Sequence, residues 1–352
     1  MKILFLPDNN PNKFAVEGQK WAFFKYWPEG TYHVDMIDAY QFPFISRKIE
    51  KKLLNMFIIQ PFKAFVRRKK YDLIIVHGSV RNFVLIGFLK YLFGFHRPNL
   101  AVFDIGCFGR IKGGLRLRIL KKVARAIDCV IYHATEQEKY YTTYLPQLRT
   151  RYHFIPLGIH PYKKTCQWDE SSKSSFIIAL GQHDNRYRDW KTLVNFWKKL
   201  VTKENEYRLI IVGRKRLYWD DIGDFESLPL AEAKDYMPVI ELTPLVEKAR
   251  FAILPLCERG HAHGQLTLLY LMSLGKAVIV SDTIGIKDYI RDGGTGIFYK
   301  TGNSDDLLEK VMYLLKNPEE IERIGRNAYD AIREQFNEKT FSEKVYEILS
   351  SY

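Results

Sequence analysis

The residues with the clearest chemical potential lie in one short stretch, Glu258 to Gln265, which holds a glutamate, two histidines and two glycines. An apolar run follows at once and predicts a buried helix, Leu266 to Leu274, that ends at Gly275. Glycines let backbone approach a ligand closely, and the free N–H groups at a helix start attract negative charge. The stretch therefore predicts an anion site, with an ordinary turn between a strand and a helix as the alternative.

The segments around this loop indicate where it lies in a fold. Two apolar runs of strand length, Ile253 to Leu256 and Ala277 to Val280, enclose the loop and its helix. Strand, loop, helix and strand make a parallel βαβ unit. Its loop leaves the carboxyl end of the first strand, which is where α/β proteins bind ligands.

A second loop with phosphate chemistry follows the expected strand Phe176 to Leu180. It reads GQHDNRYRDW, begins at Gly181 and contains Arg186 and Arg188. The planar guanidinium group of arginine chelates phosphate oxygens, so this loop is a second candidate for anion binding. The alternative is a surface loop whose arginines are incidental.

These segments resemble the donor-binding elements of GT-B glycosyltransferases of the family-four type, a large group of retaining enzymes. The residues in register with the family pattern are Pro255, Gly264, Leu269, Met272, Gly275, Val278 and Ile279. Two family glutamates are replaced. Ala262 stands where the family glutamate holds the donor sugar, although Glu258 lies just upstream. Tyr270 stands where the second glutamate binds the ribose hydroxyls.

The resemblance implies a donor site in the second half of the chain. Arg188 matches a family lysine that grips the donor diphosphate, and Gln182 replaces the family arginine. A strand is expected from Val239 to Leu242, with its exit beside the nucleotide base. The implied donor-binding residues are Gly181, Gln182, Arg186, Arg188, Leu242, His261, His263, Gly264, Gln265, Leu266, Thr267 and Tyr270.

Catalytic and acceptor residues are implied in the same way. Asp104 follows the expected strand Leu100 to Phe103, where a carboxylate orients an acceptor hydroxyl or stabilises developing positive charge, and Glu258 is the second catalytic candidate. Gly18 and His77 are the expected acceptor contacts. Asp104 could instead cap the turn before the next helix, and a lone histidine such as His77 at a strand end is more often structural.

The fold class expected from this pattern is α/β, with two Rossmann-like domains that face each other across a cleft, as in GT-B proteins. Residues 1–160 are expected to form the acceptor domain and 161–335 the nucleotide-sugar domain. Residues 336–352 are expected to form a helix that crosses back to the first domain. An aromatic-rich helix is also expected from Gln19 to Tyr26.

The charge of the chain is strongly positive and unevenly distributed. The 352 residues carry a net charge of +14, and Arg47 to Lys122 holds eighteen Lys or Arg against three Asp or Glu. Such a bias favours an anionic partner. An anionic membrane surface with a lipid-linked acceptor is the expected partner, nucleic acid is not, and a solvated basic face is the alternative. Lys51 to Arg68 has the mixed composition of an interfacial segment or a core helix, and Pro61 should break it as one helix.

The remaining composition is typical of a globular protein whose cysteines are reduced thiols. Its four cysteines show no metal or disulfide spacing, the apolar run Phe83 to Phe95 is too short and too charged to span a bilayer, and the start does not read as a signal peptide. The expected location is the cytoplasm, with peripheral attachment to the inner membrane face as an added hypothesis.

The expected activity is that of a hexosyltransferase that moves a sugar from a nucleotide-diphosphate sugar to an acceptor hydroxyl. The family resemblance implies retention of configuration, and no metal or cofactor is expected because arginines and helix dipoles neutralise the leaving group. Two alternatives stay open. A GT-B nucleotide-sugar epimerase would turn over donor alone, whereas a non-catalytic basic scaffold would bind membrane or nucleic acid without donor turnover.

Overall fold

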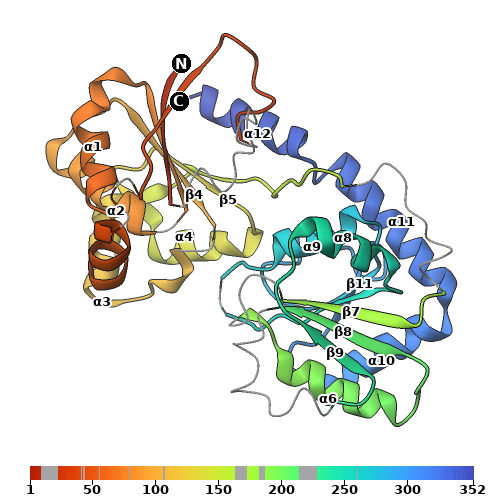
Figure 1. Cartoon of the computed structure of the whole chain (residues 1–352). Coiled ribbons are helices and arrows are strands. Elements are labelled where there is room, and N and C mark those ends of the chain that lie inside the picture. The colour runs from red at the N-terminus through yellow and green to blue at the C-terminus, as the bar shows by residue number, and fades with distance from the viewer. Residues whose placement is uncertain are drawn as a thin grey trace. The chain divides into compact units, whose positions relative to one another are not determined.

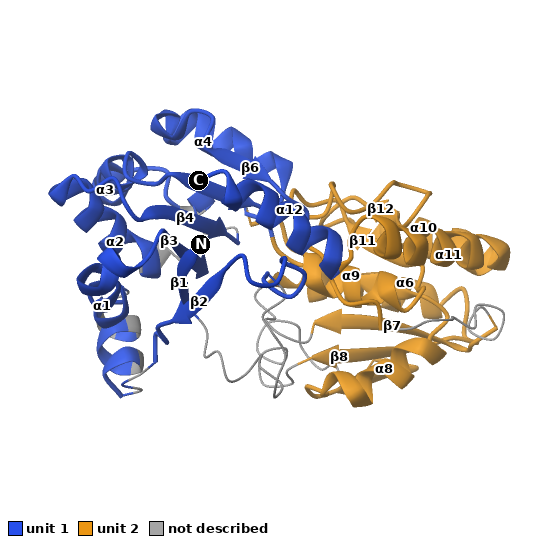
Figure 2. Ribbon diagram, turned by 90° about the horizontal axis from the view of Figure 1, so that it is seen from above, with its two compact units in different colours: residues 1–156, 260–262, 338–352 blue, residues 157–259, 263–337 orange. Residues whose placement is uncertain are grey.

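The computed structural model describes residues 1–8, 23–40, 42, 44–54, 56–78, 80–105, 108–162, 173–181, 187–213, 228–259 and 261–352 (Figure 1). Contacts group the chain into two compact units (Figure 2). Unit 1 comprises residues 1–156, 260–262 and 338–352, and unit 2 comprises residues 157–259 and 263–337. Each unit contains one six-stranded parallel sheet with helices, which confirms the α/β expectation. The domain limits given above from the sequence stay predictions.

The inner strands of the sheet of unit 1 are buried almost along their whole length, whereas its two edge strands are half-buried or exposed. In sheet order they are β2 (His33–Met36), β1 (Lys2–Pro7), β3 (Leu73–Gly78), β4 (Asn99–Asp104), β5 (Cys129–Tyr132) and β6 (Tyr152–Phe154). Every neighbouring pair runs parallel. The order changes direction beside β1, because β2 lies on one side of it and β3 on the other.

One face of this sheet is covered by α1 (Ile59–Arg67), α2 (Val80–Phe93), α3 (Gly114–Ala124) and α4 (Glu138–Tyr144), and η2 (Ile45–Leu54) precedes α1 in the chain. Leu4, Leu6, Ile74 and Val76 point toward this face, since alternate strand residues share one side of a sheet. The segment Lys51–Arg68 is broken into two helices, as expected. The break precedes Pro61, which lies in the first turn of α1, where its missing N–H needs no partner.

The opposite face of the sheet carries an aromatic turn. Phe23 and Phe24 pack against Phe5, with ring centroids 6.0 and 5.4 Å away. The expected helix over Gln19–Tyr26 is wrong for its described part, because residues 23–26 form turns. Trp27 N donates to Phe24 O at 3.3 Å, a bond between residues three apart, whereas an α-helix joins residues four apart.

Helix α12 (Glu338–Ser350) packs on this aromatic turn and confirms the expected return of the chain to the first sheet (Figure 1). Ser342 is fully buried, and its Oγ donates to Phe23 O at 2.8 Å. Trp27 Nε1 donates to Ser342 O at 3.0 Å. The ring of Phe341 lies 5.5 Å from that of Phe23. Buried hydrogen bonds and aromatic contacts together hold the helix.

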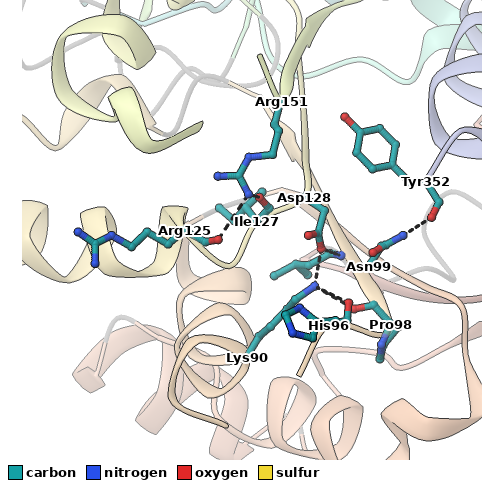
Figure 3. A network of polar contacts seen from close by, with 10 residues as sticks. Lys90, His96, Pro98, Asn99, Arg125, Ile127, Asp128, Arg151 and Tyr352 are labelled. Carbon is teal, nitrogen blue, oxygen red and sulfur yellow. Dashed lines mark hydrogen bonds and ion pairs between the residues drawn. The ribbon is translucent and has the colours of Figure 1, made fainter. Parts of the chain in front are cut away.

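A polar network at the amino ends of β4 and β5 ties the chain terminus to this sheet (Figure 3). Lys90 of α2 donates to Asp128 and to Pro98 O, the latter at 3.0 Å. Asp128 also accepts from Leu100 N at 2.7 Å. Burial lowers the pKa of Lys90, and the bond to Asp128 acts against that shift. Asn99 donates to the backbone oxygen of Tyr352, so the end of the chain is held beside β4.

Unit 2 has a second sheet with the strand order of a dinucleotide-binding fold. In sheet order its strands are β12 (Ile297–Tyr299), β11 (Val278–Ser281), β10 (Ala252–Leu254), β7 (Phe176–Gly181), β8 (Arg208–Gly213) and β9 (Ala231–Lys234). All neighbouring pairs are parallel. The chain winds from β7 to β9 on one side and returns to β10 on the other. The order therefore reverses between β7 and β10.

The helices of unit 2 cover both faces of its sheet. Helices α6 (Trp190–Val201) and α10 (Ser304–Lys316) pack on one face, and α8 (Val239–Lys248) and α9 (Gln265–Ser273) pack on the other. Helix α11 (Pro318–Glu334) contributes to both cores. Strand β7 shows the alternation that this requires. Its Ile177 and Ala179 belong to the first core, and Ile178 and Leu180 to the second.

The expected strand Val239–Leu242 is wrong, because these residues begin helix α8. Leu242 and Val246 are spaced by one helical turn, and both are buried in the core. A short, mainly apolar run does not distinguish a strand from a helix. Here the spacing of Leu242 and Val246 is that of a helix. The edge strand β9 has the sequence AEAK, which lacks the apolar alternation that would have predicted a strand. In the described part of the chain, no helix is long and apolar enough to cross a membrane.

Candidate functional site

The candidate site lies in unit 2 where the strand order reverses. Gly181 ends β7 and Leu254 ends β10, and these two strands are neighbours in the sheet. The loops that leave them therefore meet at the same edge. In open α/β sheets, ligands bind outside the carboxyl ends of the strands at such a switch point.

Gly181 allows the chain after β7 to pack tightly on the strand end. A Cβ at this position would lie 2.1 Å from Cζ2 of Trp190, which begins α6. Asp189 caps that helix, since its Oδ1 accepts from Thr192 N at 3.1 Å. Asp189 N in turn donates to Pro255 O at 3.0 Å, so the loop before α6 is fastened to the loop that leaves β10.

Arg188 connects the two loops and the helix beyond them. Its Nε donates to Leu180 O at 3.0 Å, and its Nη2 donates to Thr267 Oγ1 at 3.2 Å. The side chain is only 7% exposed. Thr267 lies in the first turn of α9, so a fixed positive charge stands at a helix N-terminus. The structure thus brings together two residues that the sequence assigned to the donor site, although they are 79 positions apart.

Gly264 begins helix α9 in a conformation that other residues adopt with strain. Its φ is 88°, and a Cβ would lie 2.7 Å from Cδ1 of Leu256. Gly264 has no side chain to cap the helix, and the first N–H groups of a helix have no partner within it. Of the next residues, Gln265 is buried, Leu266 is exposed and Thr267 is half-buried. The backbone N–H groups of this turn can therefore bind an anion.

The polar residues between β10 and α9 belong to different units. Glu258 is exposed, and its Oε2 accepts from Ile284 N at 3.3 Å. His263 is half-buried, with its ring 5.0 Å from that of Tyr187. These two residues belong to unit 2, whereas His261 groups with unit 1. Glu258 and His263 thus remain candidates for contacts to a sugar within unit 2.

Tyr270 contacts helix α8 with its hydroxyl and Tyr162 with its ring. Its hydroxyl lies 2.9 Å from Thr243 Oγ1, and its ring packs edge-on against Tyr162 at 5.2 Å. Burial raises the pKa of Tyr270 to about 12, so the hydroxyl is neutral at physiological pH. Leu242 is 2% exposed, so its side chain belongs to the core rather than to a strand exit beside a ligand.

Asp104 is placed in unit 1 as an anchor. It ends β4, is 1% exposed, and accepts from Tyr141 Oη at 2.6 Å and Gln137 Nε2 at 3.0 Å. Its Oδ1 accepts from Phe108 N at 3.3 Å, which is the turn cap that the sequence left as an alternative. Burial, followed by the Asp104 charge, raises the pKa of Tyr141 well above its ordinary value. The catalytic role of Asp104 stays a prediction.

His77 lies in β3, beside the point where the sheet of unit 1 reverses. Asp8 N donates to His77 O at 3.1 Å, which joins the ends of β1 and β3. The ring is half-buried and lies 4.9 Å from that of Phe23. Burial and then the nearby His133 lower the pKa of His77 to about 4, so the imidazole is neutral at pH 7. A neutral imidazole at a switch point suits hydrogen bonding to hydroxyl groups.

Three of the predicted site residues, Gly18, Gln182 and Arg186, lie outside the described residues. Asp8 directly follows β1, and its side chain lies beside Gly78 at the end of β3. Within the described ranges, no group of three His, Cys, Asp or Glu side chains is placed to hold a metal ion.

Comparisons with known proteins agree with this architecture. Residues 174–317 match the glycosyl transferases group 1 family. The chain is 34% identical to trehalose synthase of Thermococcus litoralis over 262 residues, 67% of this chain and 60% of that protein. It is 27% identical to N,N'-diacetylbacillosaminyl-diphospho-undecaprenol alpha-1,3-N-acetylgalactosaminyltransferase of Campylobacter jejuni over 201 residues, 55% of this chain and 50% of that protein. The matches thus span about half to 60% of these relatives.

Two solved structures share the fold over its whole length. Sucrose-phosphate synthase from Thermosynechococcus elongatus has a TM-score of 0.73 at 16% identity, covering 99% of this chain and 98% of that one. Anabaena HepE in complex with UDP has a TM-score of 0.74 at 15% identity, with full coverage of both chains. The two parallel sheets and these structural likenesses give the chain a GT-B fold. Residues 174–317, most of unit 2, are similar to the glycosyl transferases group 1 family.

Proposed function

We propose that this protein is a glycosyltransferase that moves a hexosyl group from a nucleotide-diphosphate sugar to an acceptor hydroxyl, with retention of configuration. The acceptor O–H bond and the bond between the sugar and the diphosphate break, and a glycosidic bond forms. The products are the glycoside, a nucleoside diphosphate and a proton. The similarity of residues 174–317 to the glycosyl transferases group 1 family supports the reaction class.

The observation that carries the proposal is the position of Arg188 at the N-terminus of α9. Its guanidinium group is held by Leu180 O and Thr267 Oγ1 next to a helix start without a side-chain cap. Negative charge grows on the diphosphate as the sugar leaves. A fixed cation and a helix dipole stabilise that charge without reorganising during the reaction. We therefore propose that Arg188 and the first turn of α9 bind the diphosphate and that no metal ion is needed.

The surrounding residues support a site for a sugar beside the diphosphate. Glu258 is an exposed carboxylate on the loop that leaves β10, and His263 lies on the same loop. Carboxylate and imidazole groups bind sugar hydroxyls through hydrogen bonds. Gly264 lets the loop turn into α9 against Leu256, because a Cβ there would lie 2.7 Å from Leu256 Cδ1.

The relatives indicate the substrates with which to begin. HepE was crystallised with UDP and with UDP-glucose. The Campylobacter jejuni relative is named for transfer of N-acetylgalactosamine to a diphospho-undecaprenol carrier. We propose a uridine nucleotide sugar as the donor and a glycan, either free or linked to a lipid, as the acceptor.

Nucleotide release from a panel of donors, with and without acceptor, tests the proposal. UDP release that requires an acceptor, together with a new glycoside found by mass spectrometry, is the expected result. Conversion of donor alone into an epimer would replace the transferase with an epimerase. No turnover of any donor would leave only a binding role for the fold.

A further inference from the structure

Exposed apolar side chains gather on one segment of unit 1. Eight of the large apolar residues that are exposed in the described chain lie between positions 42 and 66: Phe42, Phe44, Ile45, Ile49, Leu54, Ile58, Phe62 and Val66. On α1, Phe62 and Val66 are one helical turn apart and are 55% and 62% exposed. Gln60 and Ala64 of the same helix are buried. The apolar stripe therefore faces away from the core, opposite to the usual arrangement.

Helices η2 and α1 are fastened to one another, so their exposed side chains form one structural element. Glu50 of η2 is 2% exposed, and its Oε1 accepts from Ile58 N and Ile59 N, both at 2.8 Å. A carboxylate at a helix N-terminus is favoured by the helix dipole. At the other end, Lys63 Nζ of α1 lies 5.1 Å from the ring centre of Phe42, just before η2.

The same element continues onto the end of α2, which lies beside α1 (Figures 1 and 2). The rings of Phe65 and Phe93 are 5.2 Å apart, and the Arg68 guanidinium lies 4.1 Å from the ring centre of Phe65. Leu92 and Phe93 are both about three-fifths exposed, at 61% and 60%. We call η2, α1 and these two residues the η2–α1 surface.

The charge of this surface has one sign. From Ile45 to Lys70 the sequence contains nine Lys or Arg and a single acid, Glu50, whose carboxylate is buried as the helix cap. Lys90 does not contribute to the surface charge, because it turns inward to Asp128 (Figure 3). Cations therefore flank exposed apolar side chains, with no exposed carboxylate among the described residues of the segment.

We propose that the η2–α1 surface docks on an anionic lipid membrane. Apolar side chains such as Phe62 and Val66 would enter the boundary between headgroups and acyl chains, while lysine and arginine bind the headgroups. A nucleic acid would bind the lysine and arginine side chains but would leave the aliphatic side chains in water. It therefore fits this surface less well than a membrane does. The docking is a physical property of unit 1. Its use in reaching a lipid-linked acceptor rests on the proposed function.

Co-sedimentation of the full-length protein with phosphatidylcholine vesicles, with and without phosphatidylglycerol, tests the proposal. Binding should require phosphatidylglycerol and weaken as salt is added. The double variant Phe62→Asp, Val66→Asp should lose about tenfold or more in vesicle affinity, since each buried side chain contributes substantially. Both side chains are exposed, so the fold should survive, and circular dichroism checks this.

The matched control is Ile240→Asp, which makes the same kind of change at a site in unit 2 that is 82% exposed. It should bind vesicles as the unchanged protein does. Equal binding of the double variant, binding to neutral vesicles alone, or no vesicle binding would each overturn the proposal. So would tight binding to DNA or RNA that is unaffected by the double variant. Donor turnover with a soluble acceptor should be unchanged in the double variant, so loss of docking and loss of catalysis are distinguishable.

Discussion

Replacing Arg188 by alanine tests the candidate site most directly. The change removes a cation from the N-terminus of α9 and leaves Leu180 O and Thr267 Oγ1 without its bonds. Losing one preorganised charge-stabilising donor costs about 2–4 kcal/mol of transition-state stabilisation. Because each 1.36 kcal/mol is a factor of ten, kcat/KM should fall by about 30- to 1000-fold.

The same substitution also has a structural cost that must be measured separately. A buried carbonyl left without a donor costs about 1–3 kcal/mol of folding free energy. Arg188 is 7% exposed, so Leu180 O is not simply rehydrated when the side chain is removed. Urea unfolding of each variant should be recorded beside its kcat/KM.

Two further variants separate catalysis from stability. Arg188→Lys keeps the charge but loses the planar fork, so it should recover only part of the activity. Arg250→Ala removes another arginine of unit 2, one that stands before β10 at the opposite edge of the sheet, with its guanidinium 5.3 Å from the ring centre of Tyr207. It should change stability without the large loss of kcat/KM.

The assay is UDP release from the best donor of the panel, with donor affinity from calorimetry. A folded Arg188→Ala protein with unchanged kcat/KM would refute the role assigned to Arg188. An equal loss in Arg250→Ala would show that the effect is only one of stability.

Three other predictions follow from the same structure. His133 is 2% exposed, and burial lowers its pKa to about 4 from an ordinary value of 6.5, so unit 1 should lose about 3 kcal/mol of unfolding free energy as pH falls from 6.5 toward 4. Urea titrations should show a smaller pH effect in His133→Gln, and an equal effect would contradict the assignment. Gly264→Ala should destabilise unit 2 more than Gly302→Ala, because both have positive φ and cost about 1–2 kcal/mol of strain, but only position 264 meets Leu256. Equal losses would show that the overlap relaxes. Treatment with EDTA should leave turnover unchanged, and a loss restored by Mg²⁺ would contradict charge stabilisation by Arg188 alone.

Local pattern was enough to predict much of unit 2. The strand β10, the helix α9 and the strand β11 lie where the apolar runs indicated, and Gly275 follows α9 with a φ of 67°. These features can be predicted from the sequence because burial and positive φ restrict the residue types at single positions. The strand expected at Val239–Leu242 is wrong because a short, mainly apolar run fits the period of a strand as well as that of a helix.

The sequence by itself determined that a glycine-rich loop opens helix α9 and that an arginine follows the strand before α6. Only the tertiary structure decided that Arg188 reaches Thr267, because their meeting depends on β7 and β10 being neighbours in the sheet. It also decided that Asp104 turns toward Gln137 and Tyr141 of the following segments. Glycine conformations and apolar periods are local properties of the chain. The order of parallel strands is set by how separate βαβ units pack, and no single stretch of sequence contains it.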